Sequence, residues 1–123
     1  MAVIQKRVEL DFVNLSFYKD HVISIIKEGA VVELEEINAL LNECKLFFVD
    51  RPHIYISIRE NNYNVNPLMY SYLDDYQALK GIAIVTGKPQ TLSTAKFESK
   101  FAHLPFKVFV NIEEAKIWVR NSL

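Results

Sequence analysis

Apolar and polar residues alternate in the N-terminal part of the chain. From Val8 to Phe17 the alternation shifts once, by one residue, near Phe12, and it returns from His21 to Lys27. A period of two is typical of a strand with one buried face, and a shift in phase indicates a bulge or a break. We therefore predict two strands that pair as an antiparallel hairpin.

Gly29 predicts a turn. After it, the spacing between apolar residues becomes longer. Apolar residues recur every three or four positions from Glu33 to Phe48, which predicts an amphipathic helix that ends before Pro52. Strands and helices then alternate. We predict strands at His53–Glu60, Ile82–Thr86 and Phe106–Val110, and helices at Pro67–Lys80, at Gln90–Leu104 and after the capping residue Asn111. Gly81 is expected to end the second helix in the left-handed conformation.

The resulting element order, ββαβαβαβα, predicts a single α/β domain over residues 1–123. Its mixed sheet is expected to be mostly parallel after the opening hairpin.

Half of the residues are hydrophobic and 24% are charged, as in proteins with a packed core. The net charge of −1 gives no field that would attract nucleic acid or an anionic membrane surface. One cysteine, no signal segment and no long apolar run indicate a soluble, cytoplasmic protein without membrane insertion.

The sequence contains no complete motif for phosphate binding, metal binding or nucleophilic catalysis. Gly87-Lys88 lacks an upstream glycine at phosphate-loop spacing, and Pro89 stands where that motif has Ser or Thr. The three histidines lie in different segments, without metal-ligand spacing. Cys44 lies on the apolar stripe of its helix, where cysteine usually acts as a small hydrophobe. We therefore predict a protein that is not an enzyme and uses no metal or cofactor.

The segment from Asn61 to Asn66 is the strongest candidate for a functional surface. It joins the end of a central strand to the start of a helix, where open α/β sheets usually bind ligands. A well-capped connection explains the same residues equally well. The candidate residues for binding a partner or ligand, in the loop and on the helix after it, are Asn62, Tyr63, Asn64, Asn66, Met69 and Tyr70.

Three segments near the C-terminus carry a family resemblance: Ile82-Ala-Ile-Val-Thr-Gly, Phe101-Ala-His-Leu-Pro, and the strand and helix that begin Phe106-Lys-Val-Phe-Val-Asn-Ile-Glu-Glu-Ala. With the element order, they resemble the STAS-like superfamily, which includes anti-sigma-factor antagonists and SpoIIAA-like proteins. In the antagonists, a Ser or Thr at the start of the helix after the central strand is phosphorylated. The matching residues 61–67 contain neither, and Ser71 is the weak candidate for modification.

The resemblance implies a regulatory module that docks a protein partner, or a second copy of the chain, through residues 61–76. The alternative is a small-molecule or lipid carrier that uses an apolar pocket beside the same loop. The side chains expected to line that pocket are Phe17, Tyr63, Met69 and Tyr72.

Overall fold

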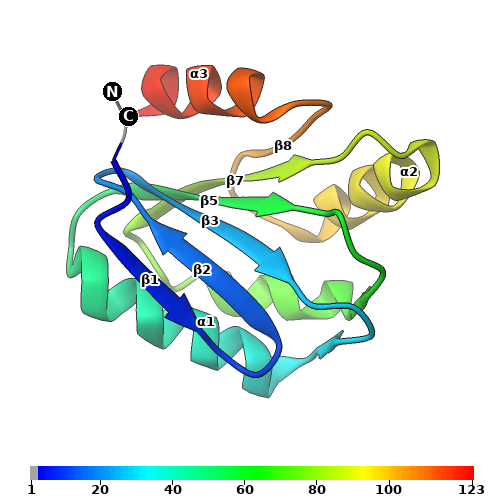
Figure 1. Cartoon of the computed structure of the whole chain (residues 1–123), viewed down its shortest axis with the longest axis horizontal. Helices are drawn as coiled ribbons and strands as arrows, with labels where there is room; N and C mark the ends of the chain where they lie inside the picture. Colours follow the sequence, from blue (N-terminus) through cyan, green and yellow to red (C-terminus); the bar gives the residue numbers. More distant parts are fainter. Residues whose placement is uncertain (1–2) are drawn as a thin grey trace.

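A computed structural model of the chain describes residues 3–123 (Figure 1). It confirms the predicted α/β class with a mixed sheet. The sheet has six strands in the order β1-β2-β3-β5-β7-β8. Two further short strands, β4 (Val31–Val32) and β6 (Asn64–Val65), pair with each other outside this sheet. The main strands are β1 (Lys6–Glu9), β2 (Val13–Phe17), β3 (His21–Ile26), β5 (His53–Ile58), β7 (Leu79–Val85) and β8 (Phe106–Phe109).

The N-terminal strands form a three-stranded antiparallel meander. The segment from Val8 to Phe17, predicted as one strand of a hairpin with a bulge or break near Phe12, is two strands. Leu10 and Val13 exchange backbone hydrogen bonds of 2.9 and 3.4 Å across a two-residue turn. The shift in hydrophobic phase is this turn, and it reverses the chain so that Val8 lies opposite Leu15. The element order therefore differs from the predicted ββαβαβαβα.

Strands β3, β5, β7 and β8 run parallel. Helix α1 (Leu34–Phe48) follows β3 and begins with a capping box between Glu33 and Glu36, as the acidic first turn favours. Helix α2 (Pro89–Glu98) and the 3-10 turn η2 (Ser99–Phe101) connect β7 to β8. Helix α3 (Ile112–Ser122) ends the chain, and its Asn111 cap accepts a hydrogen bond from the Glu114 N–H at 2.9 Å.

The segment after Asn66 is a 3-10 helix, η1 (Pro67–Leu73), and not the predicted α-helix that reaches Lys80. The Asn66 side chain caps it as predicted, by accepting a hydrogen bond from the Leu68 N–H at 3.1 Å. The helix ends early because Leu79 is already paired opposite His53 in the sheet. Gly81 lies inside β7, and its φ is not positive. The helix predicted to reach Leu104 also ends early, at Glu98, whose side chain is buried.

The sheet separates two apolar cores. Helix α1, η1 and Ala95 of α2 pack on one face, and α3 packs on the other, as Figure 1 shows for α1 and α3. Ile54 and Ile56 of β5 contribute to the α3 side. Because successive side chains along a strand point to opposite faces, the β5 residues immediately before, between and immediately after these two isoleucines point to the α1 side. That alternation puts the polar residues of β5 in the interior.

Candidate functional site

The α1-facing side of β5 carries a row of polar side chains at every second position: His53, Tyr55, Ser57 and, just after the strand, Arg59. His53, Ser57 and Arg59 are buried, and Tyr55 is partly buried. Polar groups in an interior need hydrogen-bond partners. Each side chain in this row has at least one, and the chain that follows β5 supplies three of them, Tyr63, Tyr76 and Glu98.

His53 lies at the start of the row. Its Nδ1 is 2.8 Å from the Arg51 carbonyl oxygen, and its Nε2 is 3.0 Å from the Tyr76 hydroxyl. The Nδ1–H therefore donates to the carbonyl, and Nε2 accepts from the phenol. The imidazole stacks on Phe48, with ring centroids 3.9 Å apart. Burial lowers the pKa of His53, so this histidine is a neutral structural group.

Two hydroxyl pairs occupy the middle of the row. Tyr55 donates to Ser24 Oγ at 2.7 Å, and Ser57 Oγ lies 3.3 Å from the Tyr63 hydroxyl. The second pair connects β5 to the loop that follows it, because Tyr63 belongs to that loop. The Tyr63 ring also lies beside the Arg59 guanidinium, 5.5 Å from ring centroid to Cζ. Tyr63 is therefore held in place by Ser57 of β5 and by Arg59, just after the strand.

Arg59 ends the row in a buried ion pair with Glu98 of α2. Its Nη1 and Nη2 donate to the two carboxylate oxygens at 2.7 and 2.6 Å, and Tyr70 of η1 donates to the same carboxylate. Burial is the largest influence on the pKa of Arg59 and lowers it. The hydrogen bonds to Glu98 and the electrostatic attraction of Glu98, Tyr63 and Tyr70 together outweigh burial, so the pKa of Arg59 is raised. Arg59 Nε is buried without a hydrogen-bond partner in the described chain. The pair holds three elements together and carries no net charge.

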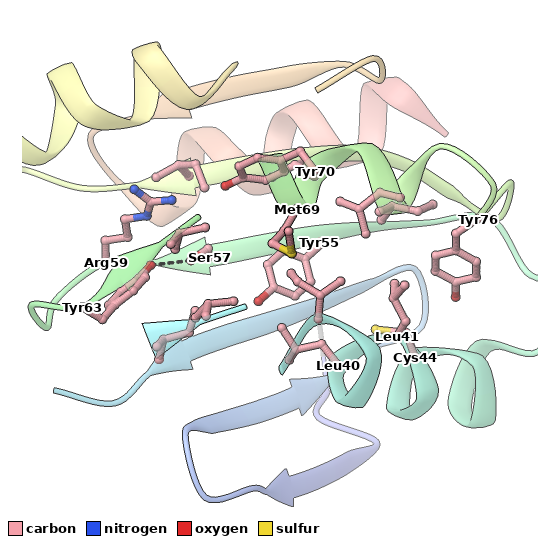
Figure 2. Close-up of a pocket in the computed structure, with 18 residues that line it drawn as sticks. Leu40, Leu41, Cys44, Tyr55, Ser57, Arg59, Tyr63, Met69, Tyr70 and Tyr76 are labelled. Carbon is pink, nitrogen blue, oxygen red and sulfur yellow. Dashed lines mark hydrogen bonds between the residues drawn. The ribbon is translucent and has the colours of Figure 1, made fainter. Parts of the chain in front are cut away.

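A cavity of about 60 Å³ lies between this row and the elements that cover it (Figure 2). Its walls are mostly apolar side chains, among them Ile37, Leu40, Leu41, Cys44, Val65, Met69, Tyr70, Leu73, Ile82 and Ile84. In Figure 2, Leu40, Leu41 and Cys44 of α1 face Tyr55 and Met69 across the cavity. Burial raises the pKa of the Cys44 thiol to about 12, so Cys44 serves as a small apolar wall residue.

A second hollow, a polar groove of about 570 Å³, lies outside the cavity at the carboxyl end of β5. The residues that line it are Glu28, Gly29, Arg59, Asn61, Asn62, Tyr63, Asn64, Val65, Gln90, Thr91, Thr94 and Glu98. Arg59, Tyr63 and Val65 line both the groove and the cavity. These three side chains form the boundary between an apolar and a polar compartment.

The groove owes its shape to the pairing of β4 (Val31–Val32) with β6 (Asn64–Val65). The Gly29 N–H donates to the Asn62 carbonyl at 2.7 Å, and Gly29 has the positive φ of 78° that glycine adopts readily. The Asn61 side chain donates to the Ile26 carbonyl at 2.9 Å. The loop after β5 is therefore fixed to the segment after β3, and not only to its own helix.

The predicted site residues fall into three places. Asn62, Tyr63 and Asn64 line the groove, while Tyr63, Met69 and Tyr70 line the cavity. Asn66 caps η1 and lines neither hollow. Ser71 is exposed on η1, where its hydroxyl donates to the Leu68 carbonyl at 3.0 Å.

Two residues expected to line an apolar pocket lie elsewhere. Phe17 is fully buried against Phe47 and Phe48, with ring centroids 4.8 and 5.7 Å away, and is not part of the cavity wall. The Tyr72 side chain is 49% exposed on the outside of η1. That pocket composition was wrong for both residues. For Tyr72 the reason is that the α-helical spacing used to place it does not apply to a 3-10 helix.

Sequence reasoning missed Glu98, Cys44 as a wall residue, and the contribution of α2 through Gln90, Thr91 and Thr94. One signal was available. A charged residue that alternates with isoleucines on a strand in the middle of a sheet points into the covered face, where it requires a buried acidic partner. This alternation of a charged residue with isoleucines predicts a buried acidic partner. It does not identify the partner, because Glu98 lies 39 residues further along the sequence.

Within residues 3–123, no three His, Cys, Asp or Glu side chains are grouped as metal ligands would be. Across the same residues, every helix is too short or too polar to span a membrane. No protein-family model, curated protein or solved structure matches the chain.

Proposed function

We propose that this protein binds a small molecule whose apolar part occupies the cavity beneath α1 and η1. The observation that carries the proposal is the cavity itself. Protein interiors are close-packed, so a hollow is an exception, and mostly apolar walls with a few fixed hydroxyls are the lining that ligand sites usually have. Tyr55, Ser57 and Tyr63 supply those hydroxyls.

The volume of the cavity limits the ligand. About 60 Å³ accommodates about four to six water-sized groups, which corresponds to a short alkyl chain or a single small ring. A longer chain requires the cover to move. Helix η1 is the weakest part of that cover, because 3-10 hydrogen bonds have poorer geometry than those of an α-helix. Its Tyr70 hydrogen bond to Glu98 opposes this movement.

Binding without catalysis is part of the proposal. The buried titratable side chains of the polar row have structural partners: His53 has the Arg51 carbonyl and Tyr76, and Arg59 has Glu98. The Cys44 thiol stays protonated, because burial raises its pKa to about 12. None of these groups is prepared to transfer a proton or to attack a substrate.

A graded series of straight-chain alcohols, from ethanol to octanol, tests the proposal by isothermal titration calorimetry. Each added methylene should strengthen binding by about 0.8 kcal/mol until the cavity is full, after which the gain should stop. Absence of saturable binding contradicts the proposal. Affinity that rises steadily with chain length also contradicts it, because nonspecific adsorption to an apolar surface has no upper limit on length.

The second candidate is the STAS-like regulatory module that docks a protein partner or a second copy of the chain. It is favoured by two exposed apolar side chains on η1, Leu68 at 61% and Tyr72 at 49%, which flank the exposed Ser71. Surface apolar residues that lie together mark interaction sites more often than single ones do.

Replacing Leu68 and Tyr72 by aspartate tests this second candidate. The double variant should lose a crosslinked partner or self-association seen in the parent protein. Leu46→Asp is the matched control, because Leu46 is 70% exposed on α1 and lies outside η1. If crosslinks map only to α3, on the opposite face of the sheet, the η1 docking surface is wrong.

A further inference from the structure

We infer that the polar groove is the second half of the same ligand site and that it accepts an uncharged head group, rich in hydroxyls or amides. The inference rests on the proposed binding function. Its first support is continuity, because Arg59, Tyr63 and Val65 line both hollows. These residues separate the two hollows, so a ligand that occupies both passes them.

The second support is the chemistry of the groove walls. Asn62, Asn64, Gln90 and Thr91 line it, and in the described chain none of their side chains forms a hydrogen bond with another residue. Asn61 and Thr94 are engaged, with the Ile26 and Gln90 carbonyls respectively. Amides and hydroxyls both donate and accept hydrogen bonds, so they suit head groups that do the same.

The third support is charge. Arg59 is already neutralised by Glu98 in a buried, two-bonded pair, so it offers no net charge to a ligand. Apart from Arg59 and Glu98, Glu28 is the acidic side chain in the groove wall, and its carboxylate accepts a hydrogen bond from the Asn62 N–H at 3.1 Å. Lys88 is held elsewhere, because its ammonium donates to the Glu60 carbonyl. A carboxylate or phosphate head would therefore meet a negative charge without a cation.

The volumes of the groove and the cavity indicate the relative sizes of the two ends of the ligand. The groove, at about 570 Å³, is much larger than the cavity, at about 60 Å³. The ligand therefore has a small apolar end, such as a short alkyl chain or one ring, and a larger uncharged head. Alkyl glycosides with short chains have this form.

Four probes that share a hexyl chain test the inference by calorimetric titration: 1-hexanol, hexyl β-glucoside, hexanoate and hexylammonium. Two or three additional hydrogen bonds to the glucoside should strengthen its binding about tenfold or more relative to 1-hexanol. Hexanoate should bind more weakly than 1-hexanol. A hexanoate affinity above that of the glucoside overturns the inference, and so does a hexylammonium affinity above it.

Two variants separate the head-group site from the cavity. The double variant Gln90→Leu, Thr91→Val should bind the glucoside no better than 1-hexanol, while its affinity for 1-hexanol stays that of the parent. The retained 1-hexanol binding shows that the double variant is folded. Glu28→Lys should raise the hexanoate affinity about tenfold or more, because it places a cation in the groove. An unchanged hexanoate affinity in Glu28→Lys contradicts the charge argument.

Failure of the inference differs from failure of the proposed function. If 1-hexanol binds the parent with saturation but the glucoside binds no better, the cavity is a ligand site and the groove is not its head-group subsite. If neither 1-hexanol nor the glucoside binds, the proposed function itself is wrong.

Discussion

Arg59 and Glu98 lie 39 residues apart in the sequence and form two hydrogen bonds, of 2.7 and 2.6 Å, in the interior of the protein. Their side chains are only 6% and 3% exposed. Tyr70 donates a third hydrogen bond to the same carboxylate. Glu98 therefore connects the end of β5, helix α2 and the 3-10 helix η1, beside the boundary between the apolar cavity and the polar groove.

Removing one charge of this pair should destabilise the protein strongly. Glu98→Gln leaves the Arg59 guanidinium buried without a counter-charge, and we expect a loss of about 3–5 kcal/mol in the free energy of unfolding. The double variant Arg59→Met, Glu98→Leu buries apolar groups instead and should regain most of that loss. Urea unfolding of Arg59→Met, of Glu98→Leu and of the double variant measures this coupling. Additive losses in the double variant contradict it.

Two substitutions of Cys44, in the wall of the cavity, should change the cavity volume in opposite directions. Cys44→Leu adds volume where space exists, so it should fold without serious loss of stability and should shift the chain-length limit of bound alcohols downward. Cys44→Ala enlarges the cavity and should shift that limit upward. Calorimetric titration of both variants with the alcohol series checks the two directions. Identical length limits in the two variants mean that the alcohols bind somewhere else.

His53 makes stability depend on pH. Because burial lowers its pKa below the ordinary 6.5, the unfolded chain takes up a proton more readily than the folded protein does. The stability contributed by neutral His53 is fully present above pH 6.5 and is lost as the pH falls below that value. We expect lower urea midpoints at about pH 5 than at about pH 8, and a smaller difference in His53→Gln. His21, whose pKa burial also lowers, should contribute pH dependence of the same sign. A pH dependence that His53→Gln retains in full contradicts this role.

Gly81 is a packing position on the far side of the sheet from the cavity. A Cβ at this position would lie 2.9 Å from Trp118 Cη2 and 3.3 Å from the Pro105 carbonyl oxygen. We expect Gly81→Ala to lower the free energy of unfolding by about 1–3 kcal/mol. Gly87→Ala is the matched control, because a Cβ there meets nothing within 4 Å, and it should be neutral or slightly stabilising. Thermal unfolding compares them, and equal effects of the two changes contradict the packing argument.

The elements that could be predicted best are those whose pattern is local. Helix α1 was expected from Glu33 to Phe48 and is observed at Leu34–Phe48, because its apolar stripe is regular and its acidic first turn forms a capping box. Strand β5 was expected from His53 to Glu60 and is observed at His53–Ile58. Isoleucines at every second position determine its register.

The elements that were mispredicted depend on distant contacts. Asp11 and Phe12 form the turn between β1 and β2 without the glycine or asparagine that usually indicates a two-residue hairpin. The start of η1 could be predicted from Asn66 and Pro67, but its end could not. That end depends on the pairing of Leu79 with His53 across the sheet, and such tertiary pairing overrides helix propensity.

The candidate site was only partly predictable for a related reason. The position of the loop after β5 follows from the order of elements alone, and it leads to Asn62, Tyr63 and Asn64. The cavity is formed where α1, η1, three strands of the main sheet and the short strands β4 and β6 fail to fill the space between them. No local pattern encodes such a gap. The role of these residues in binding remains a prediction.

Met69 offers the most direct test of the claim that the cavity binds a ligand. The chain has two methionines, so protein labelled with ¹³C at the methionine methyl groups gives few signals, and Met69→Leu identifies the one from the cavity wall. Titration with 1-hexanol should shift the Met69 methyl signal to saturation. The indole N–H signal of Trp118, which packs on the other face of the sheet, should stay in place. A Met69 signal that does not move, or that drifts linearly together with the Trp118 signal, would contradict binding in the cavity.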